Sequence, residues 1–263
     1  MEQLFVIKIG GNVVDDANFL SSFLQDFSME RAPRILVHGG GKIATRIGEK
    51  LGIESRYVNG RRITDAGALD LVTMVYGGLV NKQIVARLQA SGCNALGVTG
   101  ADAGLLPAVK RPVKEIDYGF VGDIESSRVN TAGVQLLLNH GIVPVFAPLT
   151  HDGKGQMLNT NADTIASCLA VALSEQYAVR LIFCFEKKGV LQDVANDQSV
   201  IPLIDTLRYQ TLLQEKVLAD GILPKLENAF SACRSGVKEV LIGDARDLKQ
   251  NCSGQVSGTL IRL

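Results

Sequence analysis

The chain has 263 residues, of which 46% are hydrophobic and 21% charged, and its formal net charge is zero. A chain of this length and composition can bury a sizeable core, which argues against a disordered protein. Because basic residues are not in excess, the chain lacks the long-range field that attracts nucleic acid or anionic membranes. We therefore expect a globular protein that binds small molecules, with no nucleic-acid or membrane partner.

The five cysteines are widely separated and form no CxxC pair, which argues against a disulfide framework and against a zinc site. The first residues, MEQLFVIKIGG, lack the features of a secretory signal. No apolar run approaches the roughly 18–20 residues that a membrane-spanning helix needs. These features predict a cytoplasmic protein with reduced thiols.

Short apolar segments rich in β-branched residues alternate with longer segments of helical periodicity. The predicted strands are 4–9, 35–37, 95–98, 142–146, 179–185 and 239–242. The predicted helices are 18–27, 42–51, 66–90, 131–139, 162–173, 206–217 and 225–235. This alternation is typical of an α/β fold in which helices cover both faces of a mainly parallel central sheet.

The segment 109–128 interrupts the alternation. It carries Pro112, the pair Tyr118 and Gly119, and an alternating apolar pattern over 120–124, which together predict a small β-hairpin inserted beside the main sheet. The prolines are too scattered to mark a linker, so we expect a single domain over 1–263. Within it we place a boundary between two lobes near 174–177, which gives an N-lobe of about 1–175 and a C-lobe of about 176–263.

Two glycine-rich turns each follow a predicted strand and precede a helix. They contain Gly10 and Gly11 in the first turn and 39–41 in the second. Glycines at such junctions bring backbone amides close to a ligand, where the amides can face phosphate oxygens. Lys8 lies just before the first turn in an otherwise apolar strand. Because burying an unpaired ammonium is costly, we expect Lys8 to pair with an acid or to face an anionic ligand.

Neither turn has the GxxxxGK[ST] pattern of a P-loop, and the chain has no GxGxxG dinucleotide motif. The turns therefore indicate phosphate chemistry on another scaffold. His38, His140 and His151 show no metal-ligand spacing, and we expect structural or solvated roles for them. The role of His38 stays the most open of the three, since it adjoins the three glycines.

Arg61 and Arg62 follow a turn signal and precede a long predicted helix. An arginine fork at this place can grip a substrate carboxylate through two hydrogen bonds, and a solvated surface arginine is the alternative. Lys225 stands at the start of another predicted helix, where the positive end of the helix dipole disfavours a cation. A bound anion, such as a phosphoryl group in transfer, would reverse that penalty.

Asn159, Asn161 and Asp163 lie where the helix 162–173 begins. Capping of the helix by Asn161 explains part of this cluster. A carboxylate at the same junction can orient lysine ammonium groups and keep them charged. We therefore expect Asp163 to lie near the lysines.

Taken together, these segments resemble the amino acid kinase family. The matching stretches, in the family's order, are IKIGG at 7–11, VHGGG at 37–41, NGRRIT at 59–64, GIVPVFAPL at 141–149, NTNAD at 159–163 and ADGILPK at 219–225. The resemblance is to members that act on an N-acylated glutamate. It implies ATP-dependent phosphorylation of the γ-carboxylate to an acyl phosphate, in arginine biosynthesis, with Mg²⁺ held by the ATP phosphates and no metal site in the protein. It also implies a homodimer formed through the N-lobe, which would bind the acyl amino acid, and a nucleotide site mainly on the C-lobe.

The resemblance implies a role for each matching residue. Lys8 and Lys225 would stabilise the phosphoryl group during transfer, and Asp163 would organise the two lysines. The residues implied for the acyl amino acid are Gly40, Gly41, Arg62 and Asn159. Those implied for the nucleotide are Gly10, Gly11, Glu186, Gly189, Val190, Leu191 and Ala219.

Two features leave alternatives open. The segment 185–190, FEKKGV, departs from the Ser or Thr followed by Asp that relatives usually carry, so contacts to the base or ribose are expected to differ. The acyl group stays open between acetyl, the default, and a larger group such as succinyl.

Glutamate 5-kinase, carbamate kinase and uridylate kinase share the fold, but they do not show NGxRxT together with NxNAD. A non-catalytic sensor of nucleotide or amino acid is the alternative of a different class, although it would be expected to lose one of the lysines or Asp163.

Overall fold

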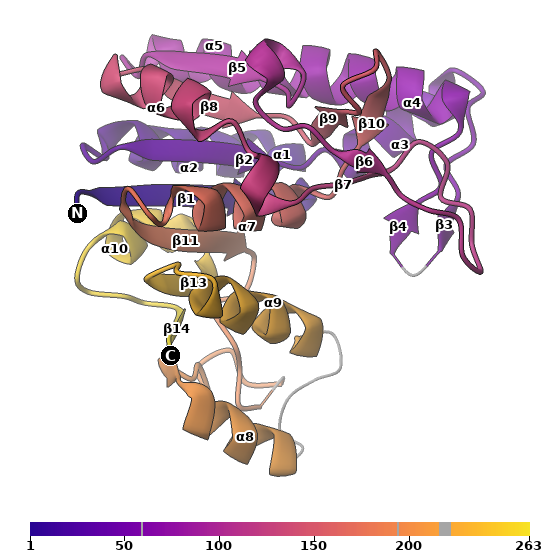
Figure 1. The fold of residues 1–263 in the computed structure, drawn as a ribbon. Coiled ribbons are helices and arrows are strands. Elements are labelled where there is room, and N and C mark those ends of the chain that lie inside the picture. The colour runs from indigo at the N-terminus through magenta and orange to yellow at the C-terminus, as the bar shows by residue number, and fades with distance from the viewer. Residues whose placement is uncertain (59, 194, 216–221) are drawn as a thin grey trace.

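The computed structural model describes residues 1–58, 60–193, 195–215 and 222–263 (Figure 1). Within these residues eight strands form one sheet, in the order β12-β14-β13-β11-β1-β2-β8-β5. Their bounds are β1 (Gln3–Ile9), β2 (Arg34–His38), β5 (Ala95–Val98), β8 (Val143–Phe146), β11 (Ala178–Phe185), β12 (Leu203–Ile204), β13 (Glu239–Asp244) and β14 (Thr259–Ile261). Neighbours from β5 to β13 run parallel, and the antiparallel pairing of β13 with β14 reverses the last two strands. The mainly parallel sheet is confirmed, and all six predicted strands belong to its parallel part.

Helices cover both faces of the sheet (Figure 1). One face carries α6 (Thr131–Asn139), α7 (Ala162–Leu173) and α9 (Leu223–Arg234), and the other carries α1 (Gly11–Asp15), α2 (Ala17–Met29), α3 (Gly41–Lys50), α4 (Ala66–Val72), α5 (Asn81–Ala90) and α10 (Leu248–Cys252). Helix α8 (Thr206–Gln214) packs beside the edge strand β12. Each predicted helix forms, although the end of the predicted helix 206–217 lies outside the described residues. In the described part of the chain, no helix combines the length and apolarity needed to span a bilayer.

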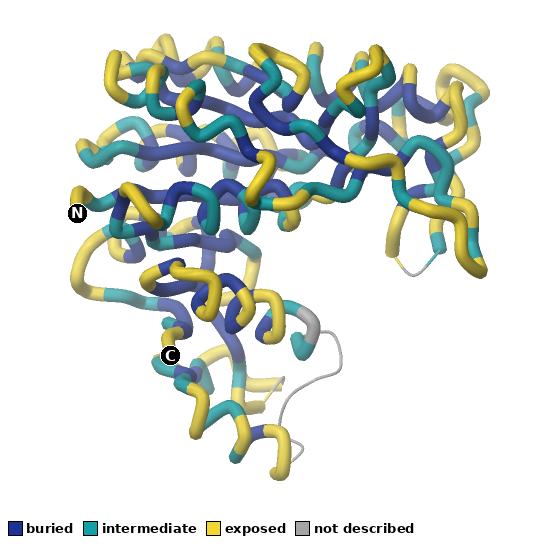
Figure 2. The backbone as a smooth tube through the Cα atoms, viewed as in Figure 1, coloured by how far each residue is buried: buried dark blue, intermediate teal, exposed yellow. Residues whose placement is uncertain are grey.

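The alternation of side chains along β1 divides the core into two apolar clusters. Leu4 and Val6 join the cluster under α7, whereas Ile7 and Ile9 join the cluster under α2 and α5. The strands of the sheet are buried along most of their length (Figure 2). Lys8 follows the spacing of Leu4 and Val6, so it points toward α7. The two clusters therefore follow the two faces of the sheet, and each joins strands from before and after the 174–177 turn.

Three small antiparallel hairpins lie beyond the carboxyl ends of the parallel strands, on the right of Figure 1. They are β3 (Tyr57–Val58) with β4 (Arg61–Arg62), β6 (Val109–Lys110) with β7 (Gly122–Asp123), and β9 (Leu149–His151) with β10 (Met157–Asn159). The predicted hairpin is confirmed as β6 and β7, with two residues in each strand. The other two hairpins were not predicted. In open α/β sheets this edge is where ligands bind.

The long helix predicted at 66–90 is continuous, but its middle is not α-helical. Between α4 and α5, residues Thr73–Val80 form a π-helical segment, η1. Such segments are rare and are frequently found at functional sites. This segment faces the second glycine turn, as described below.

Candidate active site

Lys8 and Asp163 form an ion pair at the carboxyl end of β1. Lys8 Nζ lies 2.8 Å from Asp163 Oδ1, and Lys8 is only 7% exposed. Asn161 holds the acid in place as the N-cap of α7, because its side chain accepts hydrogen bonds from the backbone N–H of Asp163 and Thr164. The expectations that Lys8 meets an acid and that Asn161 caps the helix are both confirmed.

Lys225 reaches the same place from the first turn of α9. Its Nζ lies 3.8 Å from the centroid of the Phe185 ring, and Lys8 Nζ lies 5.2 Å from the same centroid. Burial lowers the pKa of Lys225 below its ordinary value and Lys8 acts in the same direction, while Asp163 and Glu186 oppose the shift. Two ammonium groups thus share one close carboxylate. An anionic group between them would complete the charge balance.

The two glycine turns lie against each other. Gly39 N–H donates to the Ile9 carbonyl at 3.1 Å, and a β-carbon on Gly39 would lie 3.3 Å from Gly11 N. A β-carbon on Gly40 would come within 3.0 Å of the Tyr76 ring. Among the described residues no acceptor takes the backbone N–H of Gly10, Gly11, Gly40 or Gly41. Unpaired amides at strand-to-helix turns are suited to bind anions.

Arg62 is fixed beside the second turn, in a cavity of ≈ 210 Å³. It is 6% exposed, and its Nη2 donates to the Gly41 carbonyl and to Thr45 Oγ1, each at 3.0 Å. Further hydrogen bonds join the guanidinium to the hydroxyls of Ser55 and Tyr57. All these acceptors are neutral, and no acid pairs with Arg62 in the described part of the chain. Its charge is therefore available to an incoming carboxylate.

Further polar side chains line this cavity, which we call the acyl cavity after the ligand that the sequence resemblance implies. Asn159 Nδ2 donates to Thr64 Oγ1 at 2.9 Å, and both the amide and Arg62 lie on hairpin strands that the sequence did not predict as such. Arg61 and Arg111 also line it, and the Arg111 Nε donates to Asp123 Oδ1 at 3.0 Å. Three arginines line the cavity and only Arg111 has an acid partner among the described residues, so the cavity is suited to a small anion.

A second cavity, of ≈ 390 Å³, is lined in part by Lys225, and we call it the nucleotide cavity after the ligand that the sequence resemblance implies. It is lined by Asn12, Phe185, Glu186, Lys187, Gly189, Val190, Leu191, Ile222, Lys225 and Ile242. Gly189 is required there, because a β-carbon would lie 2.6 Å from Thr259 Oγ1, which accepts the Val190 N–H at 2.8 Å. An apolar wall ending at a lysine matches a flat base with a phosphate chain.

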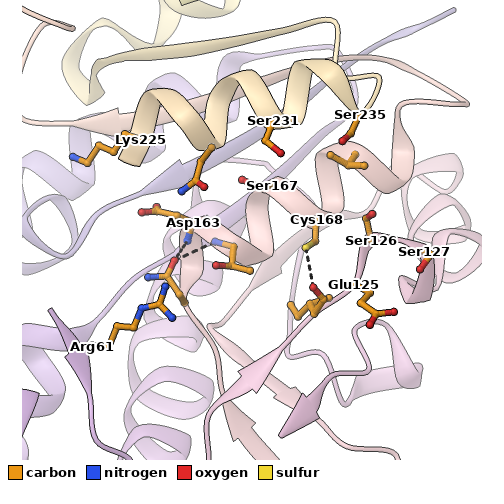
Figure 3. A pocket seen from close by; sticks show the side chains of 16 residues that line it. Arg61, Glu125, Ser126, Ser127, Asp163, Ser167, Cys168, Lys225, Ser231 and Ser235 are labelled. Carbon is orange, nitrogen blue, oxygen red and sulfur yellow. Dashed lines mark hydrogen bonds between the residues drawn. The ribbon is translucent and has the colours of Figure 1, made fainter. Parts of the chain in front are cut away.

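A larger cleft of ≈ 650 Å³ separates α7 from α9 (Figure 3). Asp163 and Lys225 stand at the same end of it, and Arg61 lies on that side as well (Figure 3). Asp163 lines only this cleft, whereas Lys225 also lines the nucleotide cavity and Arg61 the acyl cavity. Asp163 is thus reached from the cleft, which shares Lys225 with the nucleotide cavity and Arg61 with the acyl cavity.

The structure brings together nearly all the residues singled out from the sequence. Gly40, Gly41, Arg62 and Asn159 line one cavity, and Glu186, Gly189, Val190 and Leu191 line the other. Ala219 lies outside the described residues. The sequence reading missed Asn12, Tyr57, Tyr76 and Ile222. Asn12 could have been found because it directly follows the first glycine turn, but the two tyrosines carried no local signal.

Two turns of free amides and two lysines around one acid lie at the carboxyl edge of a parallel sheet, beside a cleft that adjoins both cavities. They define a phosphotransferase that acts on small anions. The comparisons specify the family. The chain belongs to the Amino acid kinase family, whose model matches residues 3–244.

Known proteins of the family lie close in sequence. The chain is 54% identical to the acetylglutamate kinase of Phocaeicola vulgatus, over 99% of each chain, and 57% identical to that of Bacteroides fragilis, over 92% of each. It also shares its fold with N-acetylglutamate synthase from Neisseria gonorrhoeae, with a TM-score of 0.82 and 21% identity, over 99% of this chain and 59% of the synthase. The predicted family and fold are confirmed.

Proposed function

We propose that this protein transfers the γ-phosphoryl group of ATP to the γ-carboxylate of N-acetyl-L-glutamate, as a step of arginine biosynthesis. The observation that carries the proposal is the grouping of Lys8, Asp163 and Lys225 at the cleft, which shares Lys225 with the nucleotide cavity and Arg61 and Asn161 with the acyl cavity. Identity of 54% and 57% to two acetylglutamate kinases, over 99% and 92% of this chain, supports the choice of substrate.

The reaction needs no general base. A glutamate side chain has an ordinary pKa of about 4.3, so the attacking carboxylate is already ionised at neutral pH. Its oxygen forms a bond to the γ-phosphorus while the bond from that phosphorus to the ADP oxygen breaks. The obstacle is repulsion between two anions. Lys8 and Lys225 offset that repulsion, and the Lys8 ion pair with Asp163 holds the first ammonium in place.

The acyl cavity orients the acceptor in this proposal. Arg62 and Asn159 hold the α-carboxylate of acetylglutamate, and the N–H groups of Gly40 and Gly41 contact the acyl amino acid. Because Arg62 is already fixed by four neutral acceptors, it loses little freedom when the carboxylate binds. The γ-carboxylate then extends toward Lys8.

The nucleotide cavity receives ATP. The base and ribose lie along Glu186, Gly189, Val190 and Leu191, and the amides of Gly10 and Gly11 face the phosphates. Mg²⁺ enters with the nucleotide, because this ion keeps most of its bonds to phosphates and water. Bound in that way it would offset further phosphate charge.

We also propose a cytoplasmic homodimer, formed through an N-lobe of about 1–175, with a C-lobe of about 176–263 that carries most of the nucleotide site. Support for the dimer comes from exposed apolar side chains on η1 and on the edge strand β5. Met74 is 56% exposed, and Leu79 and Leu96 are each 42% exposed. Sedimentation of the protein tests the dimer, and a Leu96→Lys change should shift it toward monomer if this face is the interface.

Hydroxylamine provides the direct test of the reaction. It traps an acyl phosphate as a hydroxamate, so a mixture of protein, ATP, Mg²⁺ and N-acetyl-L-glutamate should yield hydroxamate and ADP in equal amounts. Omission of either substrate should abolish both products. ADP release without any hydroxamate would contradict the proposed acceptor.

A second candidate substrate is N-succinyl-L-glutamate, favoured by one observation. Arg61 lines the acyl cavity beside Arg62 and has no acid partner among the described residues, so it can meet a second carboxylate on a longer acyl group. Comparing kcat/KM for the acetyl and succinyl compounds decides between them. If succinyl is preferred, Arg61→Gln should remove that preference and leave turnover of the acetyl compound nearly unchanged.

A further inference from the structure

A buried polar network lies under the second glycine turn. His38 Nδ1 lies 2.7 Å from the Gly39 carbonyl oxygen, and His38 Nε2 lies 3.1 Å from Asn81 Nδ2. The same amide nitrogen donates to the Val145 carbonyl on β8 at 2.9 Å. His38 is 0% exposed and Asn81 is 1% exposed, so water does not compete for these bonds.

The network fixes the protonation state of the imidazole. Asn81 Nδ2 uses one hydrogen for Val145 and the other for His38, so Nε2 accepts and the proton sits on Nδ1. His38 Nδ1–H therefore donates to the Gly39 carbonyl. Burial lowers the pKa of His38 to about 4, and Lys82 is the charged group that acts on it in the same direction. The ring is thus neutral at physiological pH.

The bond to Gly39 decides where the next amide points. In a planar trans peptide the C=O and the following N–H point in opposite directions. Because the Gly39 carbonyl is held toward the imidazole, Gly40 N–H is directed away from it. That N–H has no acceptor among the described residues, and Gly40 lines the acyl cavity. The imidazole therefore orients the unpaired Gly40 N–H by binding the opposite side of the same peptide group.

The π-helical segment η1 and the residue after it also support the second glycine turn. Asn81 is the residue directly after η1, and Tyr76 within η1 packs on Gly40 from the cavity side. Gly97 on β5 leaves room for Asn81, because a β-carbon there would overlap Asn81 Oδ1. The glycine turn is thus held between the Tyr76 ring and the pair of His38 and Asn81.

We infer that His38 and Asn81 are positioning residues, which orient the Gly39–Gly40 peptide so that its N–H binds the acyl amino acid. Neither side chain touches the substrate. This inference rests on the proposed function, since it assigns the network to the acetylglutamate side of the reaction and not to ATP.

The first experiment separates positioning from general stability. Asn81→Ala should raise KM for N-acetyl-L-glutamate about tenfold, since a misdirected N–H loses a hydrogen bond to the substrate. We expect kcat and KM for ATP to change less than about twofold. The matched control is Asn251→Ala. Asn251 is also 0% exposed, and its side chain accepts the Ser257 N–H at 3.1 Å, but it lies in α10 away from both cavities.

The second experiment keeps the side-chain volume and adds a pH signature. In Asn81→Asp the new carboxylate cannot donate to His38 Nε2, but it stabilises an imidazolium that donates from both nitrogens. Acidification should therefore restore the bond to Gly39, so KM for acetylglutamate in this variant should fall as pH is lowered from about 8.5 to about 6.5. Wild-type KM, measured in parallel, should lack this change because its imidazole stays neutral.

The outcomes are distinct. A wild-type protein without hydroxamate formation overturns the proposed function. An active wild type combined with an Asn81→Ala variant that folds and keeps its KM for acetylglutamate overturns the positioning role, as does an equal rise in KM for ATP or in the Asn251→Ala control. If Asn81→Ala does not fold, Asn81→Asp decides alone, and a KM that follows the wild-type pH profile counts against the inference.

Discussion

The acyl cavity and the nucleotide cavity both adjoin the cleft that holds Asp163 and Lys225, yet their walls differ. The acyl cavity, ≈ 210 Å³, has a buried Arg62 with four hydrogen bonds and a turn of glycines held from both sides. The nucleotide cavity, ≈ 390 Å³, has an apolar wall of Val190 and Leu191 with the exposed Glu186 at its side. Buried polar groups reject a ligand that leaves them unpaired, whereas an apolar wall discriminates weakly. The acyl cavity should therefore set substrate specificity. Substitutions there should impair the kinetics more than substitutions in the nucleotide cavity.

The largest effect is expected at Lys225, which lines both the nucleotide cavity and the cleft that holds Asp163. Lys225→Ala should lower kcat by roughly 10²–10³-fold, the usual loss when a donor to transition-state charge is removed. The matched control is Lys187→Ala, which removes an exposed lysine of the nucleotide cavity that pairs with Asp197 at 2.8 Å. Steady-state kinetics of ADP release should show the control within about twofold of wild type. Equal losses in both variants would mean that Lys225 acts only through general charge.

A smaller effect is expected on the acyl side. Arg62→Lys should raise KM for acetylglutamate by roughly 10–100-fold, because a lysine cannot replace the fixed fork and loses one charged hydrogen bond. KM for ATP and kcat should hardly change. Arg61→Lys, at the neighbouring exposed position, is the comparison and should leave acetylglutamate kinetics close to wild type. A fall in kcat alone would contradict the binding role assigned to Arg62.

A modest effect is expected on the pH profile. Lys225 acts protonated, so the rate should fall as pH rises through its pKa, which burial lowers and Asp163 raises. Asp163→Asn removes the opposing acid, so the alkaline fall should begin at lower pH than in wild type. The measurement is kcat from about pH 6 to about pH 10, each enzyme scaled to its own rate near pH 7. An unchanged alkaline limb would show that another group governs it.

The smallest effect is expected on the nucleotide side. Glu186→Gln should change KM for ATP by less than about threefold, because Glu186 is exposed and a solvated contact contributes little. The same assay with GTP in place of ATP measures how strongly the apolar wall selects its base. A loss as large as that of Arg62→Lys would remove the contrast between the two cavities.

Local pattern was sufficient for most of the fold. The strand 95–98 and the helices 131–139 and 162–173 were predicted with the bounds that the structure has, because each shows its periodicity over its whole length. Strands β12 and β14 and the hairpins of β3 with β4 and β9 with β10 were missed. Each of their strands has only two or three residues, too few to show a period of two. The π-helical form of 73–80 left no trace in the pattern either.

For the active site, the useful evidence in the sequence was residues that are energetically unfavourable at their positions. A lysine in an apolar strand, glycines at strand ends and a lysine at a helix start all carry a local cost, and that cost pointed to a ligand. Tyr76 and Asn81 carry no such cost. Tyr76 is a buried position of η1, and Asn81 is the first residue of α5. Their role depends on which turn of the chain packs against them.

By itself the sequence determined which residues would be buried, paired or free to bind anions, because hydrophobic periodicity, glycine conformation and the cost of a buried charge act within a few residues. The sequence also predicted that Asp163 lies near the lysines. Only the tertiary structure decided that its close ion pair is with Lys8, that Phe185 lies beside both lysines and that His38 and Asn81 hold a glycine turn. These contacts join residues far apart in the chain, and they exist because parallel strands end at one edge and bring their turns together there.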